Sequence, residues 1–335
     1  MEITLAIDIG SSNISIYQKN VGLVLKEPCL IVAKQTSQGY VIRAVGKDAK
    51  NLQGKTDAST TIFSPIAEGV IKSEEYAEKL LKELIKKVVP NKSIFTKLKI
   101  LVCVPTGIDT TEKEKYINLC YSVGAKEVIA IPKILTACYG LGINISANNA
   151  HLVIDMGGGS VDVGVINLNS IIEGATLGLG GRGMDTAIME VLKDKYNIEI
   201  GAKTAQKLKE EIGSLFENDN ASMEVSGINC TTKTPMTITC TAIDVQYAIL
   251  PFINEIIKVL DVTINQLEPE ISADVVRNGI YISGGLSKIA GIEKYLRNNL
   301  NVAVYSVDNG EDACIYGAGR LLGDTKLLEK VLYEL

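Results

Sequence analysis

The sequence has little of what usually marks a metal site, a disulfide framework or a histidine-based catalytic site. His151 is its single histidine, and its seven cysteines are scattered without a C-x-x-C pair. Scattered cysteines in odd number indicate free thiols in a reducing cytoplasm rather than disulfides or a zinc site. Since no cysteine or serine nucleophile motif accompanies His151, we expect a structural role for this residue.

Long apolar runs and a basic surplus are also missing. No stretch approaches the roughly 18 apolar residues of a membrane span, and the first residues lack the positive charge that starts a secretory signal. The 34 basic and 39 acidic residues give a net charge of -5, which argues against nucleic acid as the main partner. No GxxxxGK[S/T] motif occurs, which excludes a P-loop.

What the sequence does contain is typical of a globular α/β protein. With 46% hydrophobic and 22% charged residues, a chain of 335 residues suits two domains or lobes better than one core. Apolar runs such as KLKILVCVP (97–105) predict buried strands, and amphipathic stretches such as the one that begins after the candidate N-cap Ser73 predict helices. Near the end, DACIYGAGRLL (312–322) places small residues on a helix, where they permit close backbone approach.

A glycine-rich turn between two predicted strands is the first candidate site. Residues 152–166 read LVIDMGGGSVDVGVI, in which Asp155 precedes the consecutive glycines Gly157, Gly158 and Gly159. Such glycines allow backbone N–H groups to crowd around an anion, as in a phosphate-binding nest. The carboxylate cannot bind phosphate itself, but it can hold a metal ion through water against phosphates. An ordinary hairpin with a glycine-rich bulge explains this one turn equally well.

A second turn of the same kind favours the phosphate-binding interpretation. Residues 5–17 read LAIDIGSSNISIY, in which Asp8 and Gly10 are followed by Ser11, Ser12 and Asn13. The two Asp-x-Gly hairpins stand about half a chain apart, the sort of internal repeat that defines an architecture. We therefore predict two related halves that close on one nucleotide, with a hairpin from each half holding the phosphates.

Together with Gly284 and Gly285 after a predicted strand, these hairpins resemble the nucleotide fold of actin, sugar kinases and heat-shock chaperones. Over nearly the whole chain the sequence resembles the MreB family of bacterial actin homologues. The similar blocks occur in the family's order: LAIDIGSSNISIY, GLVLKEPCLIVA, SPIAEGVI, CVPTGI, GAKEVIAI, IDMGGGSVDVGVI, GMDTAI, IGAKTAQKLKEEIG and ISGGLSKIAGI.

The resemblance implies a fold class and a domain organisation. The expected fold is α/β and actin-like, that is, a duplicated ribonuclease-H-like fold with a larger and a smaller subdomain in each lobe. The first lobe is expected at 1–145, with its small subdomain at about 30–64 and the C-terminal helical segment 312–335 completing it. The second lobe is expected at 146–311, with its small subdomain at about 186–244.

The resemblance also implies ATP or ADP as the ligand, together with Mg²⁺. The residues expected to donate to the phosphates are Ser11, Ser12, Asn13, Gly157, Gly158 and Gly159, and those expected to flank the metal ion are Asp8 and Asp155. Gln206 and Lys209 are expected to face the nucleoside, with a solvated charged face as the alternative for these two, and Lys207 and Leu208 are counted with the same cofactor-binding segment. The residues expected to close over the adenosine are Gly284, Gly285, Leu286 and Ser287, with leucine at 286 where the family usually has a small residue.

One position departs from the family in a way that affects catalysis. Where the family carries the glutamate that positions the attacking water, alignment from GAKEV places Lys133. A charged lysine cannot accept a proton from water, although it can contact a phosphate as a point charge. We expect the protein to bind ATP. The sequence does not decide whether it also hydrolyses ATP. Asp162 is the remaining carboxylate close enough in sequence to orient water.

The resemblance further implies how the protein works in the cell. Ile94 and Phe95 lie in the loop PNKSIFTK and are expected to dip into the inner face of the membrane, although they could instead cap the domain core. The leading hypothesis is a cytoplasmic, ATP-binding protein that polymerises into membrane-associated filaments in cell-shape determination, with membrane proteins of the shape machinery as partners. One alternative is a hydrolysis-deficient filament scaffold for motility, polarity or DNA partition. The other is a small-molecule kinase of the same fold.

Overall fold

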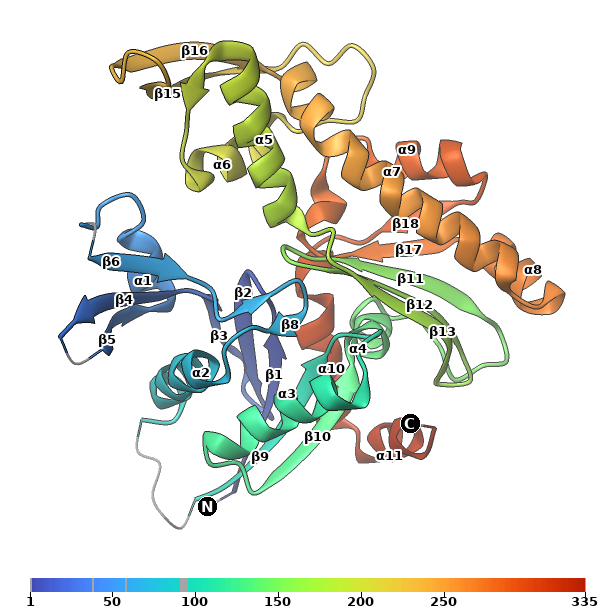
Figure 1. Cartoon of the computed structure of the whole chain (residues 1–335). Coiled ribbons are helices and arrows are strands. Elements are labelled where there is room, and N and C mark those ends of the chain that lie inside the picture. The colour runs from blue at the N-terminus through green and yellow to red at the C-terminus, as the bar shows by residue number, and fades with distance from the viewer. Residues whose placement is uncertain (1, 38, 58, 91–95, 335) are drawn as a thin grey trace.

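Two five-stranded sheets, one from each half of the sequence, organise the chain (Figure 1). The structure is a computed structural model that describes residues 2–37, 39–57, 59–90 and 96–334. The strands of the first sheet are, in order, β10 (Glu127–Pro132), β9 (Lys97–Val104), β1 (Glu2–Ile9), β2 (Asn13–Gln18) and β3 (Gly22–Pro28). Those of the second sheet are β18 (Val304–Ser306), β17 (Ile280–Ser283), β11 (His151–Met156), β12 (Val161–Asn167) and β13 (Ser170–Leu177).

The two sheets share one topology. In the first, β1 pairs antiparallel with β2 and parallel with β9. In the second, β11 pairs antiparallel with β12 and parallel with β17. The predicted glycine-rich turns are the β1–β2 and β11–β12 connections, which occupy equivalent places in the two sheets. The predicted duplicated α/β fold is thereby confirmed.

Smaller sheets stand beyond the central ones. One contains β5 (Gly39–Val45), β4 (Ile31–Thr36) and β6 (Thr60–Phe63), next to the short helix α1 (Gly46–Asn51). Another contains β14 (Ile198–Glu199), β15 (Ser222–Asn229) and β16 (Pro235–Thr241), and a short ladder joins β7 (Ile66–Ala67) to β8 (Val70–Ile71). The exact lobe and subdomain boundaries stay a prediction.

Helices cover the sheets and connect their strands. In the first half these are α2 (Glu74–Val88), α3 (Thr110–Ser122) and α4 (Lys133–Gly140). The second half adds α5 (Gly181–Tyr196), α6 (Ala202–Ile212), α7 (Ala242–Gln266), α8 (Pro269–Asn278) and α9 (Ile292–Leu300), with the 3₁₀ turns η1 (Gly285–Lys288) and η2 (Gly310–Asp312). The chain ends with α10 (Ala313–Gly323) and α11 (Thr325–Tyr333). Ser73 is the N-cap of α2 as predicted, but its side chain makes no capping hydrogen bond.

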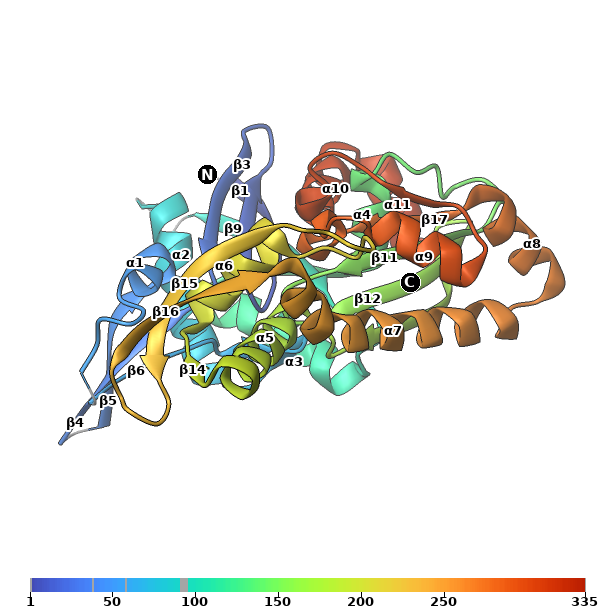
Figure 2. The ribbon, with the colours of Figure 1, turned by 90° about the horizontal axis from the view of Figure 1, so that it is seen from above.

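The two halves are joined by α4 and α10, which lie side by side between the sheets (Figures 1 and 2). Small residues allow this approach, as the sequence predicted. A Cβ atom on Gly317 would lie 1.7 Å from the carbonyl oxygen of Thr136, and one on Gly140 would lie 1.9 Å from that of Ala313. Apolar side chains from both sheets, such as Leu101 and Val153, are buried against this helix pair. The joint therefore places the two glycine-rich turns next to each other.

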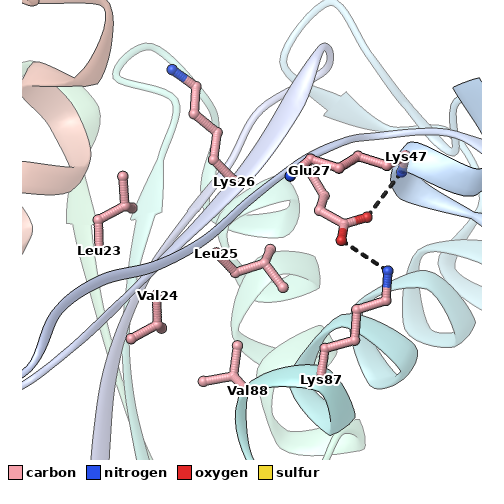
Figure 3. Close-up of a pocket in the computed structure, with 8 residues that line it drawn as sticks. All are labelled: Leu23, Val24, Leu25, Lys26, Glu27, Lys47, Lys87 and Val88. Atoms are coloured by element: carbon pink, nitrogen blue, oxygen red, sulfur yellow. Dashed lines mark hydrogen bonds and ion pairs between the residues drawn. The ribbon is translucent and has the colours of Figure 1, made fainter.

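At the outer side of the first sheet, Glu27 on β3 ties the strand to two helices (Figure 3). Its carboxylate accepts a hydrogen bond from the Lys87 ammonium at 2.8 Å and another from the backbone N–H of Lys47 at 2.9 Å. Glu27, Lys47 and Lys87 line a cavity of about 380 Å³. Glu27 is only 8% exposed, whereas the Lys87 side chain is 39% exposed, so water reaches the ion pair from the side of the lysine.

Candidate functional site

A cavity of about 790 Å³ opens between the two halves. Its walls come from both glycine-rich turns, from the N-terminal ends of α5 and α6, and from the segment that follows β17. This volume lies in the usual range of small-molecule sites. The cavity therefore lies where the topology brings the two sequence repeats together.

The two turns interlock at the floor of this cavity. A Cβ atom on Gly158 would lie 2.0 Å from the Ser12 hydroxyl oxygen, and one on Gly159 would lie 2.3 Å from the Ser11 side chain. Each turn closes in the same way, because the Gly10 N–H donates to the Asn13 carbonyl at 3.0 Å and the Gly157 N–H donates to the Ser160 carbonyl at 2.9 Å. The glycines are thus required here for close approach between the halves.

Most of the predicted site residues line this one cavity. They are Asp8, Ser11, Ser12, Asn13, Lys133, Asp155, Gly157, Gly158, Gly159, Gln206, Lys209, Gly284, Gly285 and Leu286. The structure does not bring Lys207, Leu208, Ser287 or Asp162 to it. Leu208 is buried in the core of the second half, Lys207 pairs with Glu211 at 3.7 Å, and the Ser287 hydroxyl donates to the Gly284 carbonyl. Ile94 and Phe95 lie outside the described residues.

Lys209 fixes the geometry of the α5–α6 wall. Its ammonium donates to the Gly181 carbonyl at 2.6 Å and to the Asp185 carboxylate at 2.6 Å. Burial raises the pKa of Asp185, although Lys209 opposes that shift. The wall is further tied to the β11–β12 turn, because the N–H groups of Gly181 and Arg182 donate to the carbonyls of Gly157 and Gly158.

Lys133 places a positive charge at the floor of the cavity. It is the first residue of α4, and its ammonium lies 3.0 Å from the Asp8 carboxylate. Burial alone would lower the pKa of Lys133, but the carboxylates of Asp8, Asp162 and Asp155 outweigh burial and hold that pKa well above its usual value. Lys133 is therefore charged at neutral pH.

The predicted metal residue Asp155 is already occupied by protein donors. Its carboxylate accepts hydrogen bonds from the Ser283 hydroxyl at 2.9 Å and from the Cys314 thiol at 3.4 Å. Burial raises the pKa of Asp155 to about 6, although Lys133 pulls it down. Within the described part of the chain, no group of three or more His, Cys, Asp or Glu side chains is arranged to hold a metal ion.

Asp162 lies beneath the cavity rather than in its wall. Its carboxylate accepts from the Thr106 N–H at 2.6 Å and from the Thr176 hydroxyl at 2.7 Å, and the residue is 1% exposed. These bonds join β12 to β13 and to the loop after β9. They favour a structural role over the predicted orientation of water.

Comparison with known proteins agrees with this geometry. A family model described as MreB/Mbl protein matches residues 2–330. The chain belongs to the MreB/Mbl family. The cell shape-determining protein MreB of Escherichia coli K12 is 30% identical over 321 residues, which cover 95% of this chain and 92% of the relative. Mbl of Bacillus subtilis 168 is 29% identical over 97% of each chain.

Solved structures of MreB proteins show the same fold. MreB5 of Spiroplasma citri bound to ADP superposes with a TM-score of 0.90 at 27% identity, and covers 98% of each chain. The same protein bound to AMPPNP gives a TM-score of 0.91 over 100% of this chain and 99% of the other. A MamK double helical filament, at 19% identity and a TM-score of 0.79, shares the fold. The predicted actin-like fold is thus confirmed.

Sequence reasoning missed several residues around this MreB-type cavity. Arg182 lines it from the start of α5, and burial lowers the pKa of its guanidinium. At the rim, Lys26 pairs with Asp312 at 2.6 Å and Lys288 pairs with Glu311 at 2.6 Å. The glycine loop GLGGRG before α5 is a signal that could have indicated Arg182, since loops of this kind place helix N-termini at anions. The rim pairs join distant segments and leave no local signal.

Proposed function

We propose that this chain binds ATP and ADP in the cavity between its halves and, with copies of itself, forms actin-like cytoskeletal filaments. The observation that carries this proposal is the meeting of two Asp-x-Gly turns, one from each half, at the floor of one cavity. The ADP and AMPPNP complexes of MreB5 of Spiroplasma citri, which has the same fold, support the choice of nucleotide.

We infer one orientation for a nucleotide in this cavity. Phosphates would lie against the two turns, with Ser11, Ser12 and Asn13 on one side and Gly157, Gly158 and Gly159 on the other. Backbone N–H groups in such turns form anion-binding concavities. The nucleoside would lie between Gln206 on α6 and the Gly284–Leu286 segment. Since the phosphates contact both halves, bound nucleotide would bias the angle between them and thereby the stability of the filament.

Two parts of the site bear on hydrolysis and on Mg²⁺. Lys133 occupies the position at which the family's water-positioning glutamate is expected, so ATP hydrolysis should be slow, and we infer an ATP-regulated scaffold. Mg²⁺ stays a prediction. The residues proposed for it fit it poorly, because Asp8 is paired with Lys133 and the oxygens of Asp155 accept from Ser283 and Cys314. A kinase of the same fold is not favoured, because no observation supports a second substrate site.

The cellular role follows from the family. MreB of Escherichia coli and Mbl of Bacillus subtilis are named as cell shape-determining proteins, and we propose the same role here, in filaments at the inner face of the cell membrane. None of the helices in the described ranges combines the length and apolarity needed to cross a bilayer. We propose that attachment uses the segment PNKSIFTK, which contains Ile94 and Phe95, together with membrane proteins of the shape machinery.

Sedimentation of the full chain tests nucleotide-dependent assembly. The protein is incubated with ATP, with ADP or without nucleotide, and nucleotide binding is measured in parallel by isothermal titration calorimetry. We expect ATP to bind and to increase the pelleted fraction. Failure to bind either nucleotide would overturn the proposal. Nucleotide binding without any pelleting would support the proposed nucleotide site but contradict filament formation.

Vesicle flotation tests membrane attachment separately. Filaments are mixed with anionic phospholipid vesicles, and the natural chain is compared with the double variant Ile94→Ser/Phe95→Ser. Val21→Ser is the matched control, because Val21 is an exposed apolar residue (65% exposed) at the turn between β2 and β3. We expect only the double variant to lose flotation. Equal flotation of all three proteins would contradict the loop assignment.

A further inference from the structure

The floor of the cavity contains a cation that belongs to the protein. The Lys133 side chain is 9% exposed, and its ammonium lies 3.0 Å from the Asp8 carboxylate. A Cβ atom on Gly10 would lie 3.9 Å from the same ammonium. Lys133 therefore places its charge beside the turn that is proposed to hold the phosphates.

The position of this charge is held by the backbone around it. Lys133 begins α4 directly after Pro132 ends β10, and the Ile134 N–H donates to the Thr106 hydroxyl at 3.3 Å. The Thr136 hydroxyl donates to the Lys133 carbonyl at 2.8 Å. These contacts fix the backbone of Lys133, and the ion pair with Asp8 directs its ammonium to the floor of the cavity.

An ammonium at this place competes with a divalent ion. Mg²⁺ in nucleotide sites is held by one or two carboxylates, several waters and the phosphates. Asp8 is one of the two carboxylates expected to flank the ion, and its Oδ1 lies 3.0 Å from the Lys133 ammonium as an ion pair without a hydrogen bond. The other, Asp155, is enclosed by Ser283 and Cys314. A lysine supplies a compact positive charge that can contact phosphate directly.

We propose that Lys133 acts as a built-in cation at the phosphate end of the cavity, so that this chain binds ATP without a divalent ion. The inference rests on the proposed nucleotide site and concerns how that site balances phosphate charge. It assigns Lys133 a positioning and charge-balancing role toward the nucleotide.

The test is the affinity of the natural chain for ATP, measured by calorimetry in excess EDTA and again in excess Mg²⁺. We expect the two dissociation constants to agree within about threefold, less than the 1.4 kcal/mol that a tenfold change represents. A loss of about tenfold or more in EDTA would overturn the inference while leaving the nucleotide site intact. Absence of binding in both conditions would instead overturn the proposed function.

Variants assign the effect to Lys133. Lys133→Gln removes the charge and should weaken binding in EDTA by about tenfold or more, with recovery when Mg²⁺ is added. Lys133→Arg keeps the charge and should bind in EDTA nearly as well as the natural chain. Lys258→Gln is the matched control for loss of one positive charge, because Lys258 is exposed on α7 and pairs with the nearby Glu255. If Lys133→Gln still binds in EDTA, another group balances the phosphates and the assignment is wrong. Circular dichroism of each variant checks folding, and the comparison on the natural chain does not depend on any variant.

Discussion

Gly158 and Ser12 meet across the two halves of the molecule. A Cβ atom on Gly158 would lie 2.0 Å from the Ser12 hydroxyl oxygen and 2.7 Å from the Ser12 Cβ. Each residue belongs to one of the two repeated turns, so the contact is where the halves touch at the floor of the cavity. No side chain can be added at position 158 unless one of the turns moves.

Gly158→Ala should therefore destabilise the protein. Overpacking of a tight contact typically costs about 1–3 kcal/mol, and we expect a loss of this order in urea denaturation. Gly323→Ala is the control, because a Cβ there meets nothing within 4 Å. The double variant Ser12→Gly/Gly158→Ala should recover part of the loss, since Ser12→Gly removes the atoms that clash. If the double variant loses as much free energy of unfolding as Ser12→Gly and Gly158→Ala do together, then the contact between the two residues does not cause the destabilisation.

Lys133→Glu should give the protein a measurable release of phosphate from ATP. Glutamate at this position supplies the carboxylate that orients the attacking water in the resembled family, and a positioned base of this kind typically contributes about 10²–10⁴-fold. We expect the variant to release phosphate about tenfold faster than the natural chain, or more. Lys133→Gln separates the effects of losing a charge and gaining a base, because it should show no gain. If the natural chain already matches Lys133→Glu, the catalytic position is misplaced.

The repeated turns could be predicted from sequence because each is local. Asp8 and Gly10, like Asp155 and Gly157, stand within a few residues of one another, and the same pattern recurs half a chain later. Their repetition implied the duplicated sheets and the shared cavity. By contrast, the pairing of Lys133 with Asp8 joins the start of α4 to the end of β1. Such a contact depends on the tertiary fold and has no sequence signal.

Helical periodicity explains which nucleoside-side residues reach the cavity. Gln206 and Lys209, which are expected to face the nucleoside, line the cavity, whereas Lys207 and Leu208, counted with the same segment, do not. Residues three apart share one face of a helix, whereas the residues between them point elsewhere. Lys207 accordingly pairs with Glu211 on the outside, and Leu208 is buried in the core. The helical period alone therefore distinguishes Gln206 and Lys209, which face the cavity, from Lys207 and Leu208, which do not.

Glu27→Ala should destabilise the first half of the molecule. The buried carboxylate accepts from the Lys87 ammonium and from the Lys47 N–H (Figure 3), and its removal leaves both donors without this partner. Loss of a buried hydrogen-bonding partner costs about 1–3 kcal/mol. Glu83→Ala is the control, because Glu83 pairs with Lys86 on the exposed face of α2, where such pairs contribute about 0.5 kcal/mol or less. Equal losses in urea denaturation would show that the Glu27 pair is no better shielded than the exposed one.

The dependence of stability on pH should reveal the environment of Asp155. Burial raises the pKa of its carboxyl to about 6, from an ordinary 3.8, against the opposing effect of Lys133. A carboxyl with a raised folded-state pKa binds its proton more tightly when folded, so it destabilises the fold at neutral pH. This destabilisation is relieved as the pH falls through about 6 toward about 4. Relative to Asp155→Asn, the natural chain should therefore gain free energy of unfolding between about pH 7 and pH 5.

Asp57→Asn is the control that fixes the sign of this effect. Hydrogen bonds from Ser59 and Thr60 lower the pKa of the exposed Asp57 carboxyl to about 2. A group with a lowered folded-state pKa contributes stability that is lost only as the pH falls below about 4, so its difference from the natural chain should stay constant between about pH 7 and pH 5. Urea denaturation of the three proteins at both pH values makes the comparison. If the difference in free energy of unfolding between Asp155→Asn and the natural chain is also the same at both pH values, then the Asp155 carboxyl titrates as an ordinary aspartate. The floor of the cavity would then be better hydrated than the contacts of Asp155 with Ser283 and Cys314 imply.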